Sequence, residues 1–388
     1  MLRYTAAVVL LWSATAFCYP LSYPALEPLP RDRLAALADA AAQAELAVIE
    51  SNADGTMKQV TLVVRVRTPI EVVHALVADV GGYTRFVPNM KQSDFQRDAD
   101  GRMVDTWRLE LPVSSFSGRD AYEIDTAPTG PITFHSLDTL AHYRWDFLAI
   151  PGGTLLVQTG YPDVLHANRF VRAFVKRQPP LEHGLALAAQ YMLVSAIKRE
   201  AEKRQLLPPV PLTTPSTAPL EALLDRGMVV GMRSNAAGKL EEVSALDRYY
   251  APESRVREVI ADVGAYKEFV PGVDESTVTA RLTEGVVYKL EMALPILTWS
   301  TLYEQRVSRH AIDGVGIGGD LVGARYRWDL AARGPDRTVV TYRANMPLAK
   351  NSMLVRRLFS VDASLEYGLN VAFALVQLRS MRARSEKW

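Results

Sequence analysis

The chain has 388 residues, 48% of them hydrophobic and 22% charged, and its formal net charge is +1. This length suits two ordinary domains better than one. The even charge balance argues against a nucleic-acid partner, which normally requires a basic surplus. The single cysteine, Cys18, excludes a disulfide within the chain, so apolar cores must hold the fold together.

The N-terminus has the pattern of an export signal. Arg3 precedes an apolar run over residues 4–12, and Ala14 and Ala16 follow at the spacing that a signal peptidase recognises. The run is too short to cross a bilayer as a helix. We therefore expect a signal peptide over residues 1–16, cleaved near Ala16, and a periplasmic or secreted mature protein. The alternative is an apolar helix that begins a cytosolic domain.

The sequence contains an internal duplication. Residues 78–88 (ADVGGYTRFVP) return as residues 261–271 (ADVGAYKEFVP), displaced by 183 residues. The other matches, displaced by 183 or 184 residues, are 51–55 with 234–238, 143–146 with 326–329, and 181–185 with 365–369. A repeat of this length indicates a duplicated domain rather than a solenoid.

The domain boundary is predicted from proline. Residues 206–219 are rich in proline, which favours an extended, semi-rigid spacer. We therefore expect a first domain over residues 31–205 and a second over residues 220–388.

The first unit is expected to begin with a helix and a β-hairpin. Residues 32–46 are rich in alanine and leucine and predict a helix. A hairpin follows, with strands over residues 46–50 and 59–67 around an Asp-Gly turn. Pro69 then begins a second helix, because its fixed φ and missing N–H do no harm there.

The rest of the unit is predicted as strands and one closing helix. Strands are expected at 105–111, 118–125, 132–137, 142–148 and 153–159. A long amphipathic helix over residues 181–203 closes the unit. The second unit repeats this order and ends in a helix over residues 361–384.

This order of elements resembles the START and polyketide-cyclase-like (SRPBCC) superfamily. The motif that carries the resemblance is Asp-Val-x-x-Tyr-x-x-Phe-Val-Pro over residues 79–88, and it is similar to that of coenzyme-Q-binding START proteins. The resemblance covers nearly the whole mature chain, twice. It implies an α+β fold of two tandem helix-grip domains, each a curved antiparallel sheet around a long C-terminal helix. It also implies a cavity between sheet and helix that holds an apolar molecule.

No catalytic or metal site is predicted. The six histidines have no spacing typical of zinc ligands, and no G-x-S-x-G nucleophile motif is present. The glycine-rich run over residues 314–319 predicts a hairpin, because no helix follows to bind phosphate. We expect no catalytic residue, no metal and no cofactor.

Candidate ligand contacts recur in both units or lie on the closing helix. Alternate side chains of a strand face opposite sides, so either the Tyr and Trp or the Arg and Asp of the repeated strand should face the cavity. A carboxylate on a neighbouring strand could pair with the arginine inside the cavity or lie in solvent. The candidates are Glu110, Tyr143, Arg144, Trp145, Leu187, Tyr191, Val194, Glu291, Tyr326, Arg327 and Trp328.

The segments before the closing helices alternate cations with bulky apolar side chains. Such a pattern suits contact with an anionic membrane surface. It also fits an amphipathic helix folded onto its own domain. The candidate membrane-contact residues are Arg169, Phe170, Arg172, Phe174, Leu354, Arg356 and Phe359.

Two functions follow as hypotheses. The first is non-catalytic binding and transfer of a lipid or other apolar small molecule in the cell envelope, with peripheral membrane contact. The second is a polyketide aromatase/cyclase-type enzyme, since tandem units of the resembling superfamily also fold polyketides. The cyclase acts on a cytosolic, carrier-bound intermediate, and an export signal contradicts that location.

Overall fold

The structure, a computed structural model, describes residues 22–111, 114–167, 172, 175, 180–211, 217–235, 238–294, 297–348 and 364–387. The predicted signal peptide lies outside these residues. Among the described helices, none combines the length and apolar character needed to cross a membrane.

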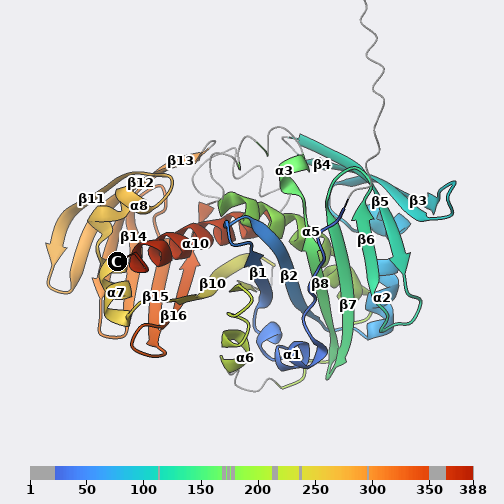
Figure 1. The fold of residues 1–388 in the computed structure, drawn as a ribbon, viewed down its shortest axis with the longest axis horizontal. Coiled ribbons are helices and arrows are strands. Elements are labelled where there is room, and N and C mark those ends of the chain that lie inside the picture. Colours follow the sequence, from blue (N-terminus) through green and yellow to red (C-terminus); the bar gives the residue numbers. More distant parts are fainter. Residues whose placement is uncertain are drawn as a thin grey trace, which may run out of the picture.

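The first unit contains short helices, eight strands and one long closing helix (Figure 1). In chain order its elements are α1 Arg31–Ala36, η1 Ala40–Ala42, β1 Glu45–Ser51, β2 Met57–Val66, α2 Ile70–Ala78, η2 Val80–Arg85, β3 Met90–Arg97, β4 Met103–Leu111, β5 Ser114–Ile124, β6 Ile132–Ser136, β7 His142–Ile150, β8 Gly153–Tyr161, α3 Val164–Ala167 and α5 Pro180–Arg204. The helix predicted over residues 32–46 is shorter than expected. Its end belongs to β1, where pairing on both sides outweighs the helix propensity of alanine.

The second unit repeats the same order. Its elements are α6 Ala218–Glu221, β9 Met228–Ser234, β10 Leu240–Tyr249, α7 Glu253–Ala261, η3 Val263–Ala265, α8 Tyr266–Phe269, β11 Val273–Leu282, β12 Gly285–Leu294, β13 Leu297–Val307, β14 Ala311–Gly319, β15 Arg325–Ala332, β16 Thr338–Asn345 and α10 Ser364–Ser385. The glycine-rich run lies in β14, as a strand between β13 and β15.

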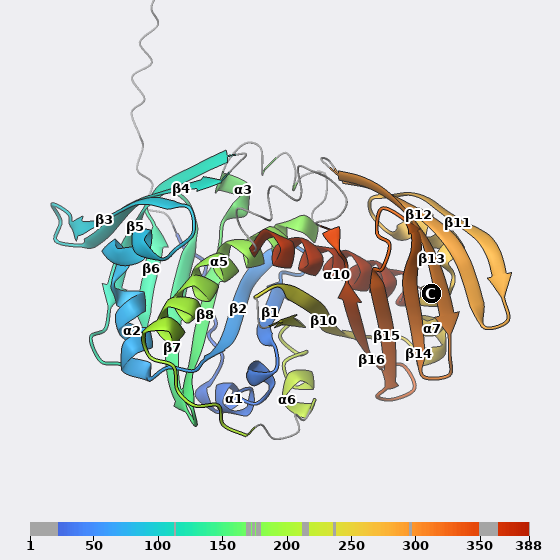
Figure 2. The ribbon, with the colours of Figure 1, turned by 180° about the vertical axis from the view of Figure 1, so that it is seen from behind.

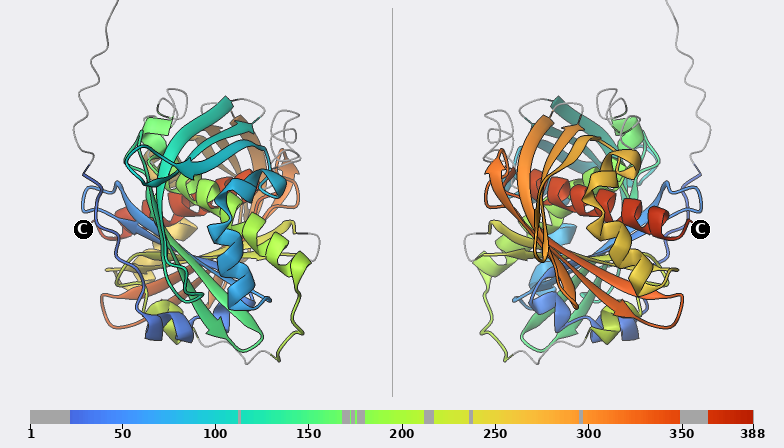
Figure 3. Two further views of the ribbon diagram at one scale, coloured as in Figure 1. Left: turned by 90° about the vertical axis from the view of Figure 1, so that its right-hand side faces the viewer. Right: turned by 90° about the vertical axis from the view of Figure 1, so that its left-hand side faces the viewer.

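The two units share one 16-stranded antiparallel sheet, because β1 of the first unit pairs with β9 of the second. Ala47 lies opposite Val230, which is its own equivalent 183 residues later. The two units are therefore related by an approximate two-fold axis that passes between these residues. Each half of the sheet curves around its own closing helix, as the two end views show (Figure 3). This arrangement confirms the predicted α+β fold of two tandem helix-grip units.

The closing helices α5 and α10 also pack against each other across the concave side of the sheet (Figure 2). They cross at Gly184 and Gly368, the glycines of the repeated segment over residues 181–185 and 365–369. A Cβ on Gly184 would lie 2.4 Å from the Cβ of Ala372 and 2.7 Å from the carbonyl oxygen of Gly368. The repeated glycines therefore allow the two backbones to meet.

The repeated motif over residues 79–88 has a structural role in both units. The Tyr83 hydroxyl donates a hydrogen bond to the Val77 carbonyl at the end of α2, at 2.7 Å. The Tyr266 hydroxyl donates to the Ile260 carbonyl at the end of α7, at 2.6 Å. Each tyrosine thus satisfies a helix-terminal carbonyl that would otherwise lack a partner.

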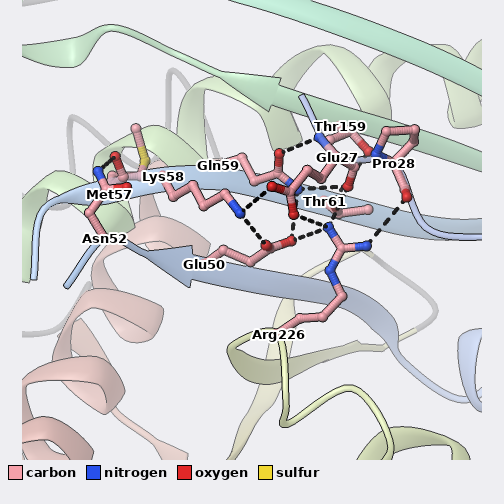
Figure 4. A network of polar contacts seen from close by, with 10 residues as sticks. All are labelled: Glu27, Pro28, Glu50, Asn52, Met57, Lys58, Gln59, Thr61, Thr159 and Arg226. Atoms are coloured by element: carbon pink, nitrogen blue, oxygen red, sulfur yellow. Dashed lines mark hydrogen bonds and ion pairs between the residues drawn. The ribbon is translucent and has the colours of Figure 1, made fainter. Parts of the chain in front are cut away.

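A polar network connects the N-terminal arm to both units (Figure 4). The carboxylate of Glu50, almost fully buried on β1, pairs with Arg226 of the second unit at 2.8 Å. It also accepts a hydrogen bond from Gln59 Nε2 on β2 at 2.7 Å. Gln59 Nε2 and Arg226 donate to the backbone carbonyl of Glu27, which fixes the arm across the sheet.

Candidate ligand-binding site

A cavity of about 320 Å³ lies in the first unit between the curved sheet and α5. Most of its wall is apolar, and one residue, Leu365, comes from α10 of the second unit. The apolar and aromatic side chains of the wall include Tyr83, Val87, Met90, Trp107, Leu109, Phe116, Tyr122, Phe134, Tyr143, Val164, Leu185, Ala188, Ala189, Met192, Leu193 and Leu365. The volume falls in the range of small-molecule pockets.

Stacked aromatic rings form one wall of the cavity. Tyr122, Phe134 and Tyr143 lie opposite one another on β5, β6 and β7. Their ring centroids are 4.8 Å apart for Tyr122 and Phe134, and 4.6 Å apart for Phe134 and Tyr143. Cross-strand pairing therefore builds a row of three stacked rings along this wall, with their faces packed against one another.

Two carboxyl groups face each other in the sheet wall of the cavity. Asp105 on β4 lies directly opposite Asp120 on β5, and their exposed fractions are 2% and 8%. The Ser93 hydroxyl donates to Asp105 at 3.0 Å. Burial raises the pKa of Asp105 to about 6. Burial, reinforced by the charge of Asp105, raises the pKa of Asp120 to about 7.

Three buried polar atoms of the cavity wall have no hydrogen-bond partner among the residues that the structure describes: Gln158 Oε1, Gln190 Oε1 and Trp107 Nε1. The orientation of Gln190 is fixed, because its Nε2 donates to the Gly160 carbonyl at 3.2 Å. The Trp107 indole N–H lies beside the Asp120 carboxyl without acceptable hydrogen-bond geometry. Buried polar atoms without a partner are costly, so they indicate a site that a polar ligand group completes.

The cavity wall carries acidic groups and no basic ones. Among the described residues that line it, none is lysine, arginine or histidine, whereas four are aspartate. Two of the four contact a side chain that is or can become cationic: Asp138 pairs with Arg119, and Asp163 contacts His166 Nδ1. Within the described residues, neither Asp105 nor Asp120 has such a partner.

The corresponding space in the second unit is filled. In the described part of this unit, two voids of about 20 Å³ each lie between the sheet and α10. The strand pairings and the helix repeat show which side chains fill it. Tyr288, Tyr303, Tyr342 and Phe373 occupy the places of Asp105, Asp120, Gln158 and Ala189. The two units therefore share a fold but differ in the presence of a binding cavity.

The repeated strand over residues 143–146 turns its tyrosine and tryptophan inward. Tyr143 lines the cavity, whereas Trp145 is fully buried in the core beneath it. Arg144 faces outward and pairs with Asp146 at 2.8 Å. The structure therefore places Arg144 away from the cavity, as strand alternation requires once Tyr143 points in.

In the second unit the same strand contributes only to packing. Tyr326 and Trp328 are buried in the filled core, and the Tyr326 hydroxyl donates to Gln305 Oε1 at 2.8 Å. Arg327 lies on the outer face, paired with Asp329 and Asp313. Of the three residues predicted here as ligand contacts, Tyr326 and Trp328 border a void of about 20 Å³ and Arg327 lies on the outer face, as far as the described residues show.

Leu187, Tyr191 and Val194 are buried on α5 but do not line the cavity. Tyr191 donates a hydrogen bond to the Glu45 carboxylate, and its ring stacks on Tyr367 at 4.6 Å. These residues pack toward the sheet and α10. The side of α5 that lines the cavity is a partial turn away from the side that was predicted to line it. The sequence does not distinguish the two sides, because α5 is apolar both where it meets the sheet and where it meets the cavity.

Glu110 and Glu291 do not form a cavity pair. Glu110 is half exposed and pairs with Arg108 at 3.3 Å. Glu291 pairs with Lys289 at 2.6 Å. The strand registers also show that Glu110 corresponds to Ala293, so the two glutamates are not equivalent. Both belong to solvated faces of the sheet.

Most of the predicted membrane-contact residues lie outside the described part of the chain. These are Arg169, Phe170, Phe174, Leu354, Arg356 and Phe359. Arg172 is described, and it is exposed, with its Nε donating to the Leu165 carbonyl at 2.9 Å. Membrane contact stays a prediction.

Asp105 and Asp120 were not predicted from the sequence. The pattern that could have revealed Asp105 is the alternation along β4, where Met103, Asp105, Trp107 and Leu109 share one face. A single carboxyl group on an apolar strand face indicates a buried acid. Its partner follows from the β4–β5 hairpin register, which the sequence does not fix.

No family model and no curated protein matches the chain. Solved structures similar to it are of di-domain ARO/CYC and START proteins. The di-domain ARO/CYC StfQ of the steffimycin biosynthetic pathway is 14% identical, with a TM-score of 0.29, covering 84% of this chain and 98% of that chain. Both units have the helix-grip fold. That assignment depends on the strand order and closing helices described above.

Single-domain structures match one unit. The STAR-related lipid transfer protein of Xanthomonas axonopodis is 17% identical, with a TM-score of 0.33, covering 41% of this chain and 94% of that chain. The Zhui aromatase/cyclase of Streptomyces sp. R1128 is 16% identical, with a TM-score of 0.32, covering 38% and 94%. At these values the similarities carry no argument about ligand or activity.

Proposed function

We propose that this protein binds and carries one small, largely apolar molecule per chain, in the cavity of its first unit. The observation that carries the proposal is the contrast between the described parts of the units: one cavity of about 320 Å³ in the first, and two voids of about 20 Å³ each in the second. At roughly 30 Å³ per liquid water molecule, the larger cavity equals about ten waters. It therefore suits a single mid-sized molecule.

The second unit supports the site without binding a ligand of its own. Its α10 packs along α5 and contributes Leu365 to the cavity wall. Its own space is occupied by side chains that replace the carboxyl pair and the small residue Ala189. We infer that the duplication kept one binding unit and turned the other into a scaffold.

A stoichiometry measurement tests this proposal. The neutral apolar probe N-phenyl-1-naphthylamine is expected to bind at one molecule per chain in native mass spectrometry and in fluorescence titration. Ala189→Phe, which copies Phe373 of the second unit, should fill the cavity and weaken binding at least tenfold. The matched control Phe373→Leu should leave the stoichiometry at one. Two bound probes per chain, or undiminished binding by Ala189→Phe, would contradict the proposal.

An acid–base enzyme is the second candidate, and the carboxyl pair favours it. A carboxyl group with a pKa near neutrality can both take and give a proton at working pH, as general acid–base catalysis requires. The two candidates differ in the fate of the molecule that copurifies with the protein. A carrier returns it unchanged, whereas an enzyme converts it in a step that Asp120→Asn abolishes.

We further propose that the mature protein works in the cell envelope after export. The proposal depends on Arg3, the apolar run over residues 4–12 and the small residues before Phe17. N-terminal sequencing of protein purified from its native cells is expected to begin after Ala16 or close to it. An intact Met1 on soluble cytoplasmic material would refute the export proposal and strengthen the cyclase alternative.

A further inference from the structure

The cavity wall has an imbalance of charge and of hydrogen-bonding groups. Asp105 and Asp120 face each other across β4 and β5, more than nine-tenths buried and without a basic side chain in the described cavity wall. Two ionised carboxylates this close repel, and burial penalises each of them. A ligand that brings a positive charge to this point would relieve both costs.

The unpaired oxygens of the wall require a donor. Gln158 and Gln190 are 1% and 2% exposed, and the Oε1 atom of each has no hydrogen-bond partner. Because Gln190 Nε2 is held by the Gly160 carbonyl, its Oε1 is the atom left to accept. An ammonium group carries three donors and no acceptor, so it matches carboxylates and amide oxygens together.

The aromatic wall adds a third complementary feature. The rings of Tyr122, Phe134 and Tyr143 are stacked with their faces against one another, so this row offers apolar contact to an aromatic or aliphatic body. An anionic headgroup would meet the carboxyl pair and find no cation among the described lining residues. Fatty acid carboxylates and phosphate-bearing lipids therefore do not match this cavity.

We propose that the cavity of the first unit selects an amine: a small aromatic or apolar molecule whose ammonium group binds at Asp105 and Asp120. This inference depends on the proposed binding function and names its ligand class. The apolar body lies against the tyrosine and phenylalanine wall and α5. The ammonium group reaches the carboxyl pair, where it replaces the missing basic partner.

Three probes of one shape and different charge test the inference. They are 1-naphthylmethylamine, 1-naphthylmethanol and 1-naphthoate, measured by isothermal titration calorimetry at pH 7.5 with the full mature chain. The amine is expected to bind at least tenfold more tightly than the alcohol, and the carboxylate at least tenfold more weakly than the alcohol. This order follows from the acidic wall, which attracts the ammonium group and repels the carboxylate.

Isosteric variants assign the effect to the carboxyl pair. Asp120→Asn and Asp105→Asn should each weaken amine binding at least tenfold and change alcohol binding by less than about threefold. Asp336→Asn, on the exposed turn between β15 and β16, is the control and should change neither. Circular dichroism confirms that each variant is folded.

The outcomes separate this inference from the binding proposal. If the alcohol or the carboxylate binds as tightly as the amine, or the asparagine variants keep the preference for the amine, the ligand class is wrong while the cavity still binds. If none of the three probes binds, the binding function itself fails, and the ligand class fails with it.

Discussion

Gly184→Val is expected to destabilise the protein by about 3 kcal/mol or more. The substituted Cβ would lie 2.4 Å from the Ala372 Cβ and 2.7 Å from the Gly368 carbonyl oxygen, both on α10. Neither neighbour can rotate away, since one is a short side chain and the other is backbone. Overpacking of a tight contact costs about 1–3 kcal/mol, and a β-branched side chain between two helix backbones lies at or above the top of that range.

The measurement is chemical denaturation monitored by circular dichroism. Gly264→Val is the matched control, because Gly264 is exposed and its added Cβ would meet only atoms 3.8 Å or farther away. It should cost well under half as much. Because Leu365 of α10 lines the cavity, Gly184→Val should also weaken probe binding. Equal stability of the two variants would show that the helices do not depend on this crossing.

Asp120→Asn is expected to stabilise the ligand-free protein at pH 8 and to remove much of its pH dependence. Burial raises the pKa of Asp120 from 3.8 to about 7, so between these values the folded state holds a proton that the unfolded state has released. Stability therefore falls as the pH rises through this interval. Each pKa unit corresponds to about 1.4 kcal/mol, so Asp120 alone accounts for about 4 kcal/mol of lost stability at pH 8.

The charged groups around Asp120 are Asp105 and Asp138, and both add to the effect. Unfolding free energies at pH 5 and pH 8 measure it for the wild type, Asp120→Asn and the exposed control Asp336→Asn. The wild type and the control should lose several kcal/mol between the two pH values, whereas Asp120→Asn should lose much less. A wild type that is equally stable at both would mean that Asp120 is ionised in the folded state.

The fold could be predicted because its signals are local and repeated. The repeat gave two copies of one order of elements, and turn residues separated most strands. The pairing of β1 with β9 could not be predicted in the same way. Both strands are apolar and contain β-branched residues, which predicts that each is a strand. The local sequence does not determine which other strand each one pairs with.

The site was predicted less well than the fold, because it depends on which side of an element faces the cavity. Tyr143 was found by its recurrence, although its equivalent Tyr326 fills a core. Leu187 lies two residues from the cavity-lining Ala189, on another side of the same apolar helix. The carboxyl pair is present in the first copy alone, because tyrosines replace both aspartates in the second. Residues shared by the two copies therefore could not reveal it.

The sheet junction has a consequence for the origin of the chain. Glu45 lies opposite Met232, which is the equivalent of Ile49, and Ile49 lies opposite Met228, which is the equivalent of Glu45. The pairing is therefore symmetric about Ala47 and Val230. The glycines of the helix crossing are reciprocal in the same way. Self-complementary contacts of this kind are what two identical subunits form about a two-fold axis. The chain thus has the architecture of an isologous homodimer fused head to tail. Once fused, the two former subunits were free to differ, and one could give up its cavity without the other losing its partner.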